Sequence, residues 1–230
     1  MSFVTVPVHL GVIPDGNRRW ARSRNLPALE GHRRGVDVAK KMAIAAFDRG
    51  IRYFTIFGFS TENWQRAQEE VGYLMDLWYG LLINEFGDLE KRGVRFRLLG
   101  SRDGLSKRLV KAIDDTEERT RGNKHGTLGL CLNYGGRAEL ADAYRSLMRA
   151  GVTADQVDPG MIEKHLYASD IPPVDMVVRT SGEQRVSGFM LWRIAYAELY
   201  FVKKHWPDFT VEELDAALAE YTNRHRRFGN

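Results

Sequence analysis

The chain has 230 residues, of which 43% are hydrophobic, a formal net charge of +4 at pH 7 and a single cysteine, Cys131. It is long enough to bury a sizeable core and shows no linker-like stretch, so we expect one domain over residues 1–230. No run approaches the ~18 apolar residues of a membrane span. The first residues lack a signal-peptide pattern and a lone cysteine cannot form an internal disulfide, which favours a cytoplasmic protein.

The mildly basic balance does not indicate nucleic acid as a partner. The chain lacks zinc-knuckle spacing, a helix-turn-helix pattern and an RNP-like aromatic strand. Its arginines gather instead beside apolar segments, at residues 18–34, 179–185 and 224–227. Most single arginines are simply solvated, but this clustering favours a small polyanion with an apolar tail.

Short β-rich runs alternate with helical patterns along the chain. The expected strands are residues 8–13, 53–57, 94–99, 127–132, 176–179 and 199–202. The expected helices are residues 32–49, 69–92, 105–121, 137–150, 159–168 and a last helix that runs from a capping box at Thr210 and Glu213 to about residue 226. This alternation predicts an α/β fold with a mostly parallel, six-stranded central sheet flanked by helices.

Ligands of parallel sheets bind at the carboxyl ends of the strands, so the loops that follow the strands carry the candidate site. Residues 15–17, 59–64, 133–137 and 179–183 occupy such loops and are rich in polar side chains or glycine. Four loops of this kind at one edge of a sheet are difficult to explain as turns alone.

The first of these loops is the most informative. Asp15 is an oxygen ligand suited to Mg²⁺, and Gly16 lets backbone N–H groups approach an anion. Arg18 and Arg19 can hold phosphate oxygens with forked hydrogen bonds. The loop therefore suits a magnesium diphosphate, although Asp-Gly-Asn is also an ordinary turn sequence.

Five blocks, in this order, resemble the cis-prenyltransferase family, whose best-known members are the undecaprenyl diphosphate synthases. The blocks are Asp15-Gly16-Asn17-Arg18-Arg19-Trp20, Gly31-His32, Phe59-Ser60-Thr61-Glu62-Asn63-Trp64 with Arg66, Asn133-Tyr134-Gly135-Gly136-Arg137, and residues 179–187 continued by 195–201. The resemblance covers about residues 9–229. It implies an enzyme that condenses isopentenyl diphosphate with an allylic diphosphate, makes a Z double bond and releases diphosphate.

The resemblance also implies roles for single residues. Asp15 would be the Mg²⁺-associated carboxylate, and Glu198 would be a second metal ligand. The catalytic polar groups would be Asp15, His32, Ser60 and Asn63. The substrate-binding residues would be Gly16, Asn17, Arg18, Arg19, Trp20, Phe59, Trp64, Arg66, Arg179, Arg185, Ser187, Arg227 and Gly229. The last two would belong to a tail that completes the neighbouring subunit's site in a homodimer.

Physical chemistry agrees with this assignment. Two diphosphates repel by about 3 kcal/mol for each pair of unit charges at ~5 Å and an effective dielectric of ~20, so arginines and Mg²⁺ are needed to bring them together. A growing prenyl tail needs a dry tunnel, in which each buried CH₂ gains about 0.8 kcal/mol. Trp78 and Phe86 are the candidates for its floor, with ordinary core packing as the alternative for each.

Several positions depart from the pattern of the polyprenyl synthases. They are Pro14, Arg18, Ala28, Ser181 and Gly188, of which Ala28 stands where many members have an arginine at the allylic site. We therefore expect a short or medium product. One alternative is an irregular member that joins allylic units head-to-middle into a branched, lavandulyl-type diphosphate. Another is a non-catalytic subunit, which the presence of Asp15, Asn63 and Glu198 disfavours.

Overall fold

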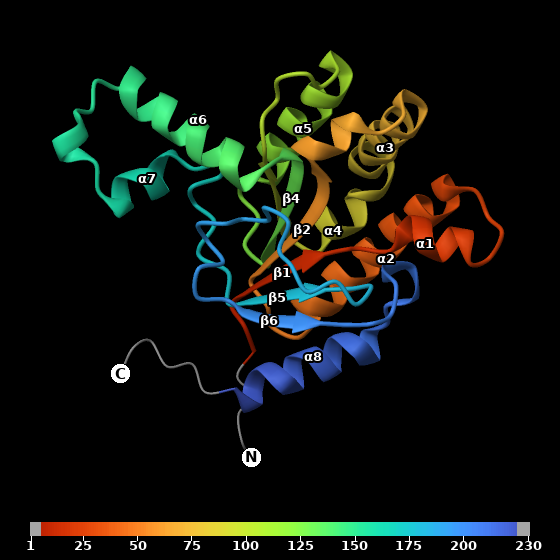
Figure 1. Ribbon diagram of the computed structural model, residues 1–230. Coiled ribbons are helices and arrows are strands. Elements are labelled where there is room, and N and C mark those ends of the chain that lie inside the picture. Colours follow the sequence, from red (N-terminus) through yellow and green to blue (C-terminus); the bar gives the residue numbers. More distant parts are fainter. Residues whose placement is uncertain (1–5, 225–230) are drawn as a thin grey trace.

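The computed structural model describes residues 6–224, and at its centre lies one six-stranded sheet (Figure 1). The strands are β1 His9–Ile13, β2 Tyr53–Ser60, β3 Val94–Leu99, β4 Gly126–Tyr134, β5 Met176–Arg179 and β6 Glu198–Phe201. All neighbours pair in parallel, in the order β3-β4-β2-β1-β5-β6. The α/β fold expected from the sequence is therefore confirmed.

Helices follow most of the strands. They are α1 Asn17–Arg22, α2 Ala28–Asp48, α3 Gln68–Gly80, α4 Gly87–Lys91, α5 Lys107–Thr120, α6 Gly136–Arg149, α7 Pro159–His165 and α8 Val211–Asn223. The capping box at the start of α8 is confirmed, because Thr210 and Glu213 make both of its hydrogen bonds. The helix ends at Asn223, and residues 225 and 226 lie outside the described part. No helix within residues 6–224 has the length and apolar character to cross a membrane.

The largest differences between predicted and observed helix bounds concern two helices. The single helix expected over residues 69–92 is divided, because a π-helical segment, Leu81–Glu85, separates α3 from α4. Helix α2 begins four residues earlier than its apolar face suggests. The short helix α1 packs closely on it: a Cβ at Gly31 would lie 2.1 Å from the carbonyl oxygen of Asn17.

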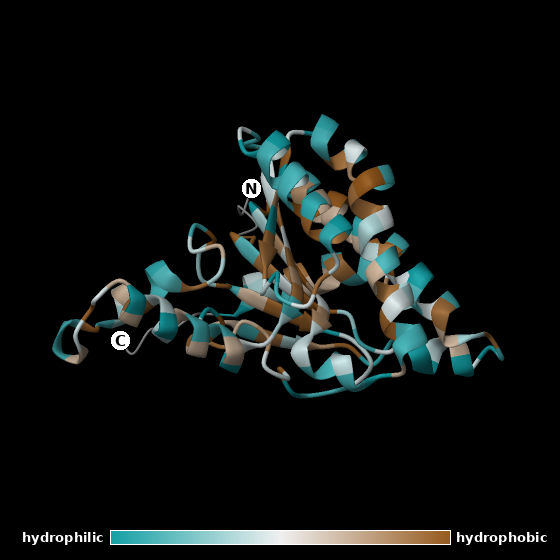
Figure 2. Ribbon diagram, turned by 90° about the horizontal axis from the view of Figure 1, so that it is seen from above, coloured by the Kyte–Doolittle hydropathy of each residue, from teal (hydrophilic) through white to brown (hydrophobic). Residues whose placement is uncertain are grey.

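Both faces of the sheet are covered, as a parallel sheet requires. On one face, alternate strand residues such as Leu10 and Val12 pack against α2, α3, α5 and α8. On the other face, Ile13 packs against the segment that leads to β6, and a Cβ at Gly11 would lie 2.7 Å from the ring of Phe189. Hydrophobic residues accordingly concentrate in the middle of the molecule, along the strands (Figure 2).

The strand order places a crevice beside β1. The chain leaves β1 towards β2 on one side, and after β4 it returns to β5 on the other side of β1. The carboxyl ends of β1 and β5 therefore mark the point where the order reverses, which is where such sheets bind ligands. The loops that carry Asp15 and Ser181 both start at this point.

The buried side chain of His9 gives the fold a pH dependence. Its Nδ1 lies 2.9 Å from the carbonyl oxygen of Pro172 and its Nε2 lies 2.8 Å from Oγ1 of Thr55. Burial lowers the pKa of His9 to about 4, against the smaller effect of the Pro172 carbonyl. The unfolded chain binds a proton near pH 6.5 that the folded chain excludes, so stability falls as the pH drops from 6.5 to 4.

Denaturant unfolding at several pH values tests this. We expect the free energy of unfolding to fall by about 3 kcal/mol over that range through His9 alone. The variant His9→Gln should lose this part of the pH dependence. The variant His125→Gln, which changes an exposed histidine, should keep it. Equal pH dependence in the wild type and in His9→Gln would contradict the assignment.

Candidate active site

Asp15 and Arg179 meet at the crevice between β1 and β5. Nη2 of Arg179 donates a hydrogen bond of 2.8 Å to Oδ2 of Asp15, and Nη2 of Arg19 donates one of 3.2 Å to Oδ1. Burial alone would raise the pKa of Asp15, but the hydrogen bonds and charges of Arg179 and Arg19 outweigh it and hold that pKa below its usual value. Asp15 is therefore an ionised carboxylate at neutral pH.

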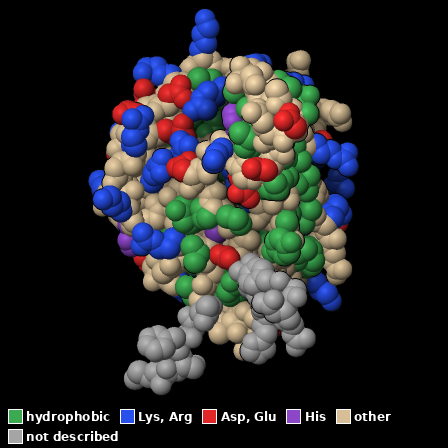
Figure 3. Space-filling model, turned by 90° about the vertical axis from the view of Figure 1, so that its left-hand side faces the viewer, with side chains coloured by type: hydrophobic (Ala, Val, Ile, Leu, Met, Phe, Trp, Pro, Cys, Tyr) green, Lys and Arg blue, Asp and Glu red, His purple; other side chains and the backbone are tan. Residues whose placement is uncertain are grey.

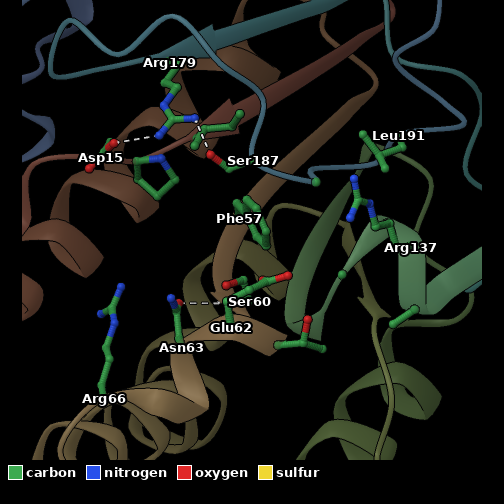
Figure 4. A pocket seen from close by; sticks show the side chains of 17 residues that line it. Asp15, Phe57, Ser60, Glu62, Asn63, Arg66, Arg137, Arg179, Ser187 and Leu191 are labelled. Atoms are coloured by element: carbon green, nitrogen blue, oxygen red, sulfur yellow. Dashed lines mark hydrogen bonds and ion pairs between the residues drawn. The ribbon is translucent and has the colours of Figure 1, made fainter.

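Arg179 is fixed from several sides and only 4% exposed. Its Nη1 donates 2.9 Å to Oγ of Ser187 and also to the carbonyl oxygen of Arg185. Its buried Nε has no hydrogen-bond partner within the described residues. Figure 4 shows the guanidinium between Asp15 and Ser187, at the wall of a cavity. The side chain is thus held in place, and its Nε–H remains available to donate to a ligand.

That cavity has a volume of about 870 Å³ and lies at the carboxyl ends of β1, β2, β4 and β5. Its cationic side chains are Arg66, Arg137 and Arg179 (Figure 4). Arg137 is exposed and, among the described residues, has no carboxylate partner. We call this space the larger head-group cavity, because its arginines suit an anionic group.

A second cationic cavity, of about 400 Å³, adjoins α1. It is lined by Pro14, Asp15, Gly16, Asn17, Arg18, Arg19, Arg22, His32 and Arg66. Four arginines around one small space repel each other and attract an anion. We call it the smaller head-group cavity. The sequence block from Asp15 to Arg19, the block with His32 and the block with Arg66 are brought together here.

Glu70, which the sequence analysis did not single out, neutralises part of this charge. Its Oε1 lies 3.1 Å from Nη1 of Arg66, 3.1 Å from Nε2 of His32 and 3.9 Å from Nε of Arg18. Burial lowers the pKa of His32, and the Glu70 carboxylate offsets this only in part. The spacing of four between Arg66 and Glu70 at the start of a helix was a signal available in the sequence.

A third cavity of about 100 Å³ opens at the same place, with polar side chains such as Asn17 and His32 on one part of its wall and an apolar part beside them. Pro14 and Arg66 line all three cavities, and Asp15 lines both head-group cavities. Leu74 and Trp78 form part of the apolar wall. Two anionic groups and one apolar chain can therefore meet at a single junction.

Ser60 and Asn63 form a capping box at the end of β2. The Ser60 N–H donates 3.1 Å to Oδ1 of Asn63, and the Ser60 side chain accepts from the Asn63 N–H. Both residues line the larger head-group cavity. Since its oxygen is engaged, the amide nitrogen of Asn63 is the part of that side chain left for a ligand.

Some of the expected binding residues hold loops in place. The indole N–H of Trp20 donates 2.7 Å to Oδ1 of Asp208, and that of Trp64 donates 2.7 Å to Oδ1 of Asn133. Phe59 is 1% exposed and packs against Trp64, with their ring centroids 5.2 Å apart. These contacts position the loops around the cavities.

Arg185 reaches the site through a carboxylate that the sequence analysis did not assign a role. Oε1 of Glu183 accepts 2.7 Å from Nη1 of Arg19, and its Oε2 accepts 2.5 Å from Nη1 of Arg185. Glu183 thereby ties the loop after β1 to the loop after β5. Both arginines are well exposed and free to exchange Glu183 for an anion.

The structure does not bring the two expected metal carboxylates together. Glu198 begins β6 and pairs with Met176 at the amino end of β5. Asp15, in contrast, lies beyond the carboxyl end of β1, at the other end of the strands. Glu198 accepts a hydrogen bond of 3.0 Å from Nη1 of Arg224. Within one chain, Asp15 and Glu198 therefore do not share an ion. Arg227 and Gly229 lie outside the described residues.

Asp15 alone fits a magnesium ion that is shared with a ligand. Residues 6–224 contain no group of three or more His, Cys, Asp or Glu side chains arranged to hold a metal. Mg²⁺ commonly binds one or two carboxylates together with substrate phosphates and water, so it does not need such a group. An ionised carboxylate between two cavities that suit phosphate matches this donor set.

A carboxylate between two cationic cavities, beside a third cavity with an apolar wall, suits a transferase whose substrates carry a diphosphate and an apolar chain. The undecaprenyl diphosphate synthase family model matches residues 13–229. The chain is 46% identical to isoprenyl transferase 2 of Bradyrhizobium diazoefficiens over 228 residues, which cover 97% of this chain and 90% of that protein. It is 42% identical to an isoprenyl transferase of Thermotoga maritima over 97% of both chains.

Solved structures agree with this result. Lavandulyl diphosphate synthase from Lavandula x intermedia, in complex with dimethylallyl diphosphate, has a TM-score of 0.93 at 34% identity and covers 98% of this chain and 99% of its own. A probable undecaprenyl diphosphate synthase from Campylobacter jejuni has a TM-score of 0.83 at 27% identity, with 98% and 100% covered. The chain belongs to the cis-prenyltransferase family of undecaprenyl diphosphate synthases, as its motifs indicated, and is a prenyltransferase.

The ion pairs of Asp15 predict an order of effects on its pKa. The variant Arg179→Met should raise the pKa of Asp15 more than Arg19→Gln does. Both arginines lower that pKa against the effect of burial, and Arg179 lowers it more. NMR titration of the Asp15 carboxyl carbon measures both shifts, with circular dichroism as the check on folding. A larger effect of Arg19→Gln would contradict the geometry described above.

Proposed function

We propose that this chain transfers the prenyl group of an allylic diphosphate to isopentenyl diphosphate, forming a Z double bond and releasing diphosphate. The observation that carries the proposal is the junction at Pro14 and Arg66, where two cationic cavities meet a third cavity with an apolar wall. Two charged head groups and one prenyl tail need this arrangement. The product we propose is short or medium in length.

In this proposal, each cavity binds a different part of the two substrates. The smaller head-group cavity binds the allylic diphosphate through Arg18, Arg19 and the backbone at Gly16. The larger one binds isopentenyl diphosphate through Arg179 and Ser187, with Arg185 at its rim. The third cavity takes the allylic tail, so that the reacting carbons lie near Asn63.

The arginines provide most of the electrostatic stabilisation of the two diphosphates. They offset the repulsion of about 3 kcal/mol for each pair of unit charges at ~5 Å. As the allylic C–O bond breaks, negative charge grows on the departing diphosphate, where Arg18 and Arg19 are already placed to stabilise it. When bound at Asp15, Mg²⁺ neutralises phosphate charge and polarises the leaving oxygen.

The uncharged polar groups orient the substrates. Burial disfavours the protonated form of His32, so its Nε2–H donates to Glu70 while the ring adds no charge to the cavity. Ser60 and Asn63 hold each other, which leaves the amide nitrogen of Asn63 to donate to a substrate oxygen. The transfer needs no protein nucleophile.

A second candidate function is irregular condensation of two allylic units into a branched diphosphate. It is favoured by Ala28, which supplies no cation at the start of α2, and by the TM-score of 0.93 with lavandulyl diphosphate synthase. Incubation with dimethylallyl diphosphate as the sole substrate separates the two functions. The regular enzyme should give no product without isopentenyl diphosphate, and a branched ten-carbon diphosphate would favour the second function.

We also propose that the chain acts as a cytoplasmic homodimer. A groove of about 780 Å³, lined by apolar residues that include Val8 and Tyr196, lies near the amino ends of β1 and β5. The Tyr196 side chain is 75% exposed, and the neighbouring edge strand β6 leaves Leu199 37% exposed. Hydrophobic side chains are exposed over part of the face in Figure 3. Sedimentation equilibrium tests the dimer, which Tyr196→Arg should weaken.

Asp15→Asn tests the proposed metal carboxylate. This isosteric change removes the negative charge that would hold Mg²⁺, so we expect turnover to fall by a factor of about 10² or more. Turnover is measured as incorporation of labelled isopentenyl diphosphate in Mg²⁺. The control is Asp115→Asn, which changes an exposed carboxylate on α5 and should leave turnover unchanged. Full activity of Asp15→Asn would refute the assignment.

A further inference from the structure

Ser181 and His205 share a hydrogen bond behind the turn that carries Gly16. Oγ of Ser181 lies 2.7 Å from Nδ1 of His205. Ser181 follows β5 in the chain and His205 follows β6, so the contact joins two loops at the carboxyl ends of neighbouring strands. Ser181 is 8% exposed, and neither residue lines a head-group cavity or the third cavity. The pair therefore lies behind the walls of the site.

The turn at Gly16 packs directly against this pair. A Cβ added at Gly16 would lie 2.6 Å from Oγ of Ser181 and 2.7 Å from Nδ1 of His205, closer than a real contact allows. Gly16 is buried and has a φ of +104°, a conformation that residues with a side chain rarely adopt. The two polar atoms fill the space beside its Cα, so they limit how far the turn can move toward them.

The peptide group between Asp15 and Gly16 is held by the same two loops. The carbonyl oxygen of Asp15 accepts 2.7 Å from Oγ1 of Thr180 and 3.0 Å from the N–H of Trp206. These two donors are the immediate sequence neighbours of the hydrogen-bonded pair. In each loop, one residue thus fixes the carbonyl and the adjacent residue packs on the glycine. The position of the turn depends on both loops together.

The backbone of Ser181 indicates that its hydroxyl is needed. The residue has a φ of +76°, in the left-handed region where glycine is unstrained and other residues are not. A glycine at this position would keep the same backbone without strain and would lose only the hydroxyl. Residue 181 is also one of the positions where the chain departs from the pattern of the polyprenyl synthases. The contact of the hydroxyl with His205 accounts for the strained serine.

We propose that Ser181 and His205 are positioning residues, which fix the turn at Gly16 and thereby set the affinity of the smaller head-group cavity for a diphosphate. The turn carries Asp15 before it and Arg18 after it, and both line that cavity. A turn that is held before the ligand arrives loses less conformational freedom on binding. The inference rests on the proposed prenyl transfer and adds two residues on which binding of its allylic substrate depends.

Two variants of Ser181 separate this role from a contribution to stability. Ser181→Ala and Ser181→Gly both remove the hydroxyl, but only the alanine keeps a side chain at a positive φ. We expect KM for dimethylallyl diphosphate to rise at least tenfold in both, while kcat and KM for isopentenyl diphosphate change less than threefold. The melting temperature should be lower for Ser181→Ala than for Ser181→Gly. A KM that rose only in the less stable variant would overturn the proposal.

Two variants of His205 test the hydrogen bond itself. His205→Asn keeps a polar atom at the place of Nδ1, whereas His205→Gln moves the polar atoms one bond further out, to the place of Nε2. We expect the asparagine variant to keep KM for dimethylallyl diphosphate within threefold of the wild type and the glutamine variant to raise it at least tenfold. His125→Gln, which changes an exposed histidine, is the control and should leave it unchanged. Equal values for the two His205 variants would contradict the role of Nδ1.

A binding measurement makes the test independent of turnover. Dimethylallyl thiolodiphosphate and isopentenyl thiolodiphosphate are titrated calorimetrically, in Mg²⁺, into the wild type, Ser181→Gly and His205→Asn. We expect Ser181→Gly to bind the dimethylallyl analogue at least tenfold more weakly and His205→Asn to bind it as the wild type does. Equal affinities in the wild type and Ser181→Gly, or no binding to the wild type, would overturn the inference. No turnover in the wild type with any pair of substrates would count against the proposed function, while the affinities still decide the role of the pair.

Discussion

The ion pair of Asp15 and Arg179 is the constraint on which the site depends. The guanidinium is 4% exposed, and its charge is tolerated because the carboxylate after β1 accepts from it at 2.8 Å. Buried ion pairs add little net stability, because desolvation of the charges offsets their attraction. What this pair provides is position: it holds a carboxylate and a cation at the point where the strand order reverses.

Around that pair, the other charged residues of the site form groups in which one carboxylate neutralises several cations. Glu183 joins Arg19 to Arg185, and Glu70 lies among Arg18, His32 and Arg66. Each carboxylate holds cations together that would otherwise separate. A diphosphate carries acceptors of the same kind, so its binding can exchange these internal partners for ligand oxygens at small conformational cost. The cavity is in this sense preorganised for an anion.

The sheet was predictable from the sequence because its signals are local. Apolar runs such as the one that contains Leu10 and Val12 define the strands, and Thr210 and Glu213 define the start of α8 within four residues. The position of the site followed from a general property of parallel sheets, once the polar loops had been assigned to strand ends.

The remaining features depend on contacts between distant residues. Trp20 is tied to Asp208 and Trp64 to Asn133, and no periodicity relates such pairs. The π-helical segment that interrupts the predicted helix over residues 69–92 leaves no mark in a helical pattern of apolar residues. The separation of Asp15 from Glu198 follows from strand register, since Glu198 lies at the amino end of β6.

Helix α3 links the two halves of the proposed reaction. Glu70, in its first turn, fixes Arg66 and His32 beside the smaller head-group cavity, and Trp78, two turns later, lines the third cavity. A helix is stiff over this length, so a shift of α3 moves both ends together. The contacts beside the smaller head-group cavity and the apolar wall of the third cavity are therefore positioned by a single element.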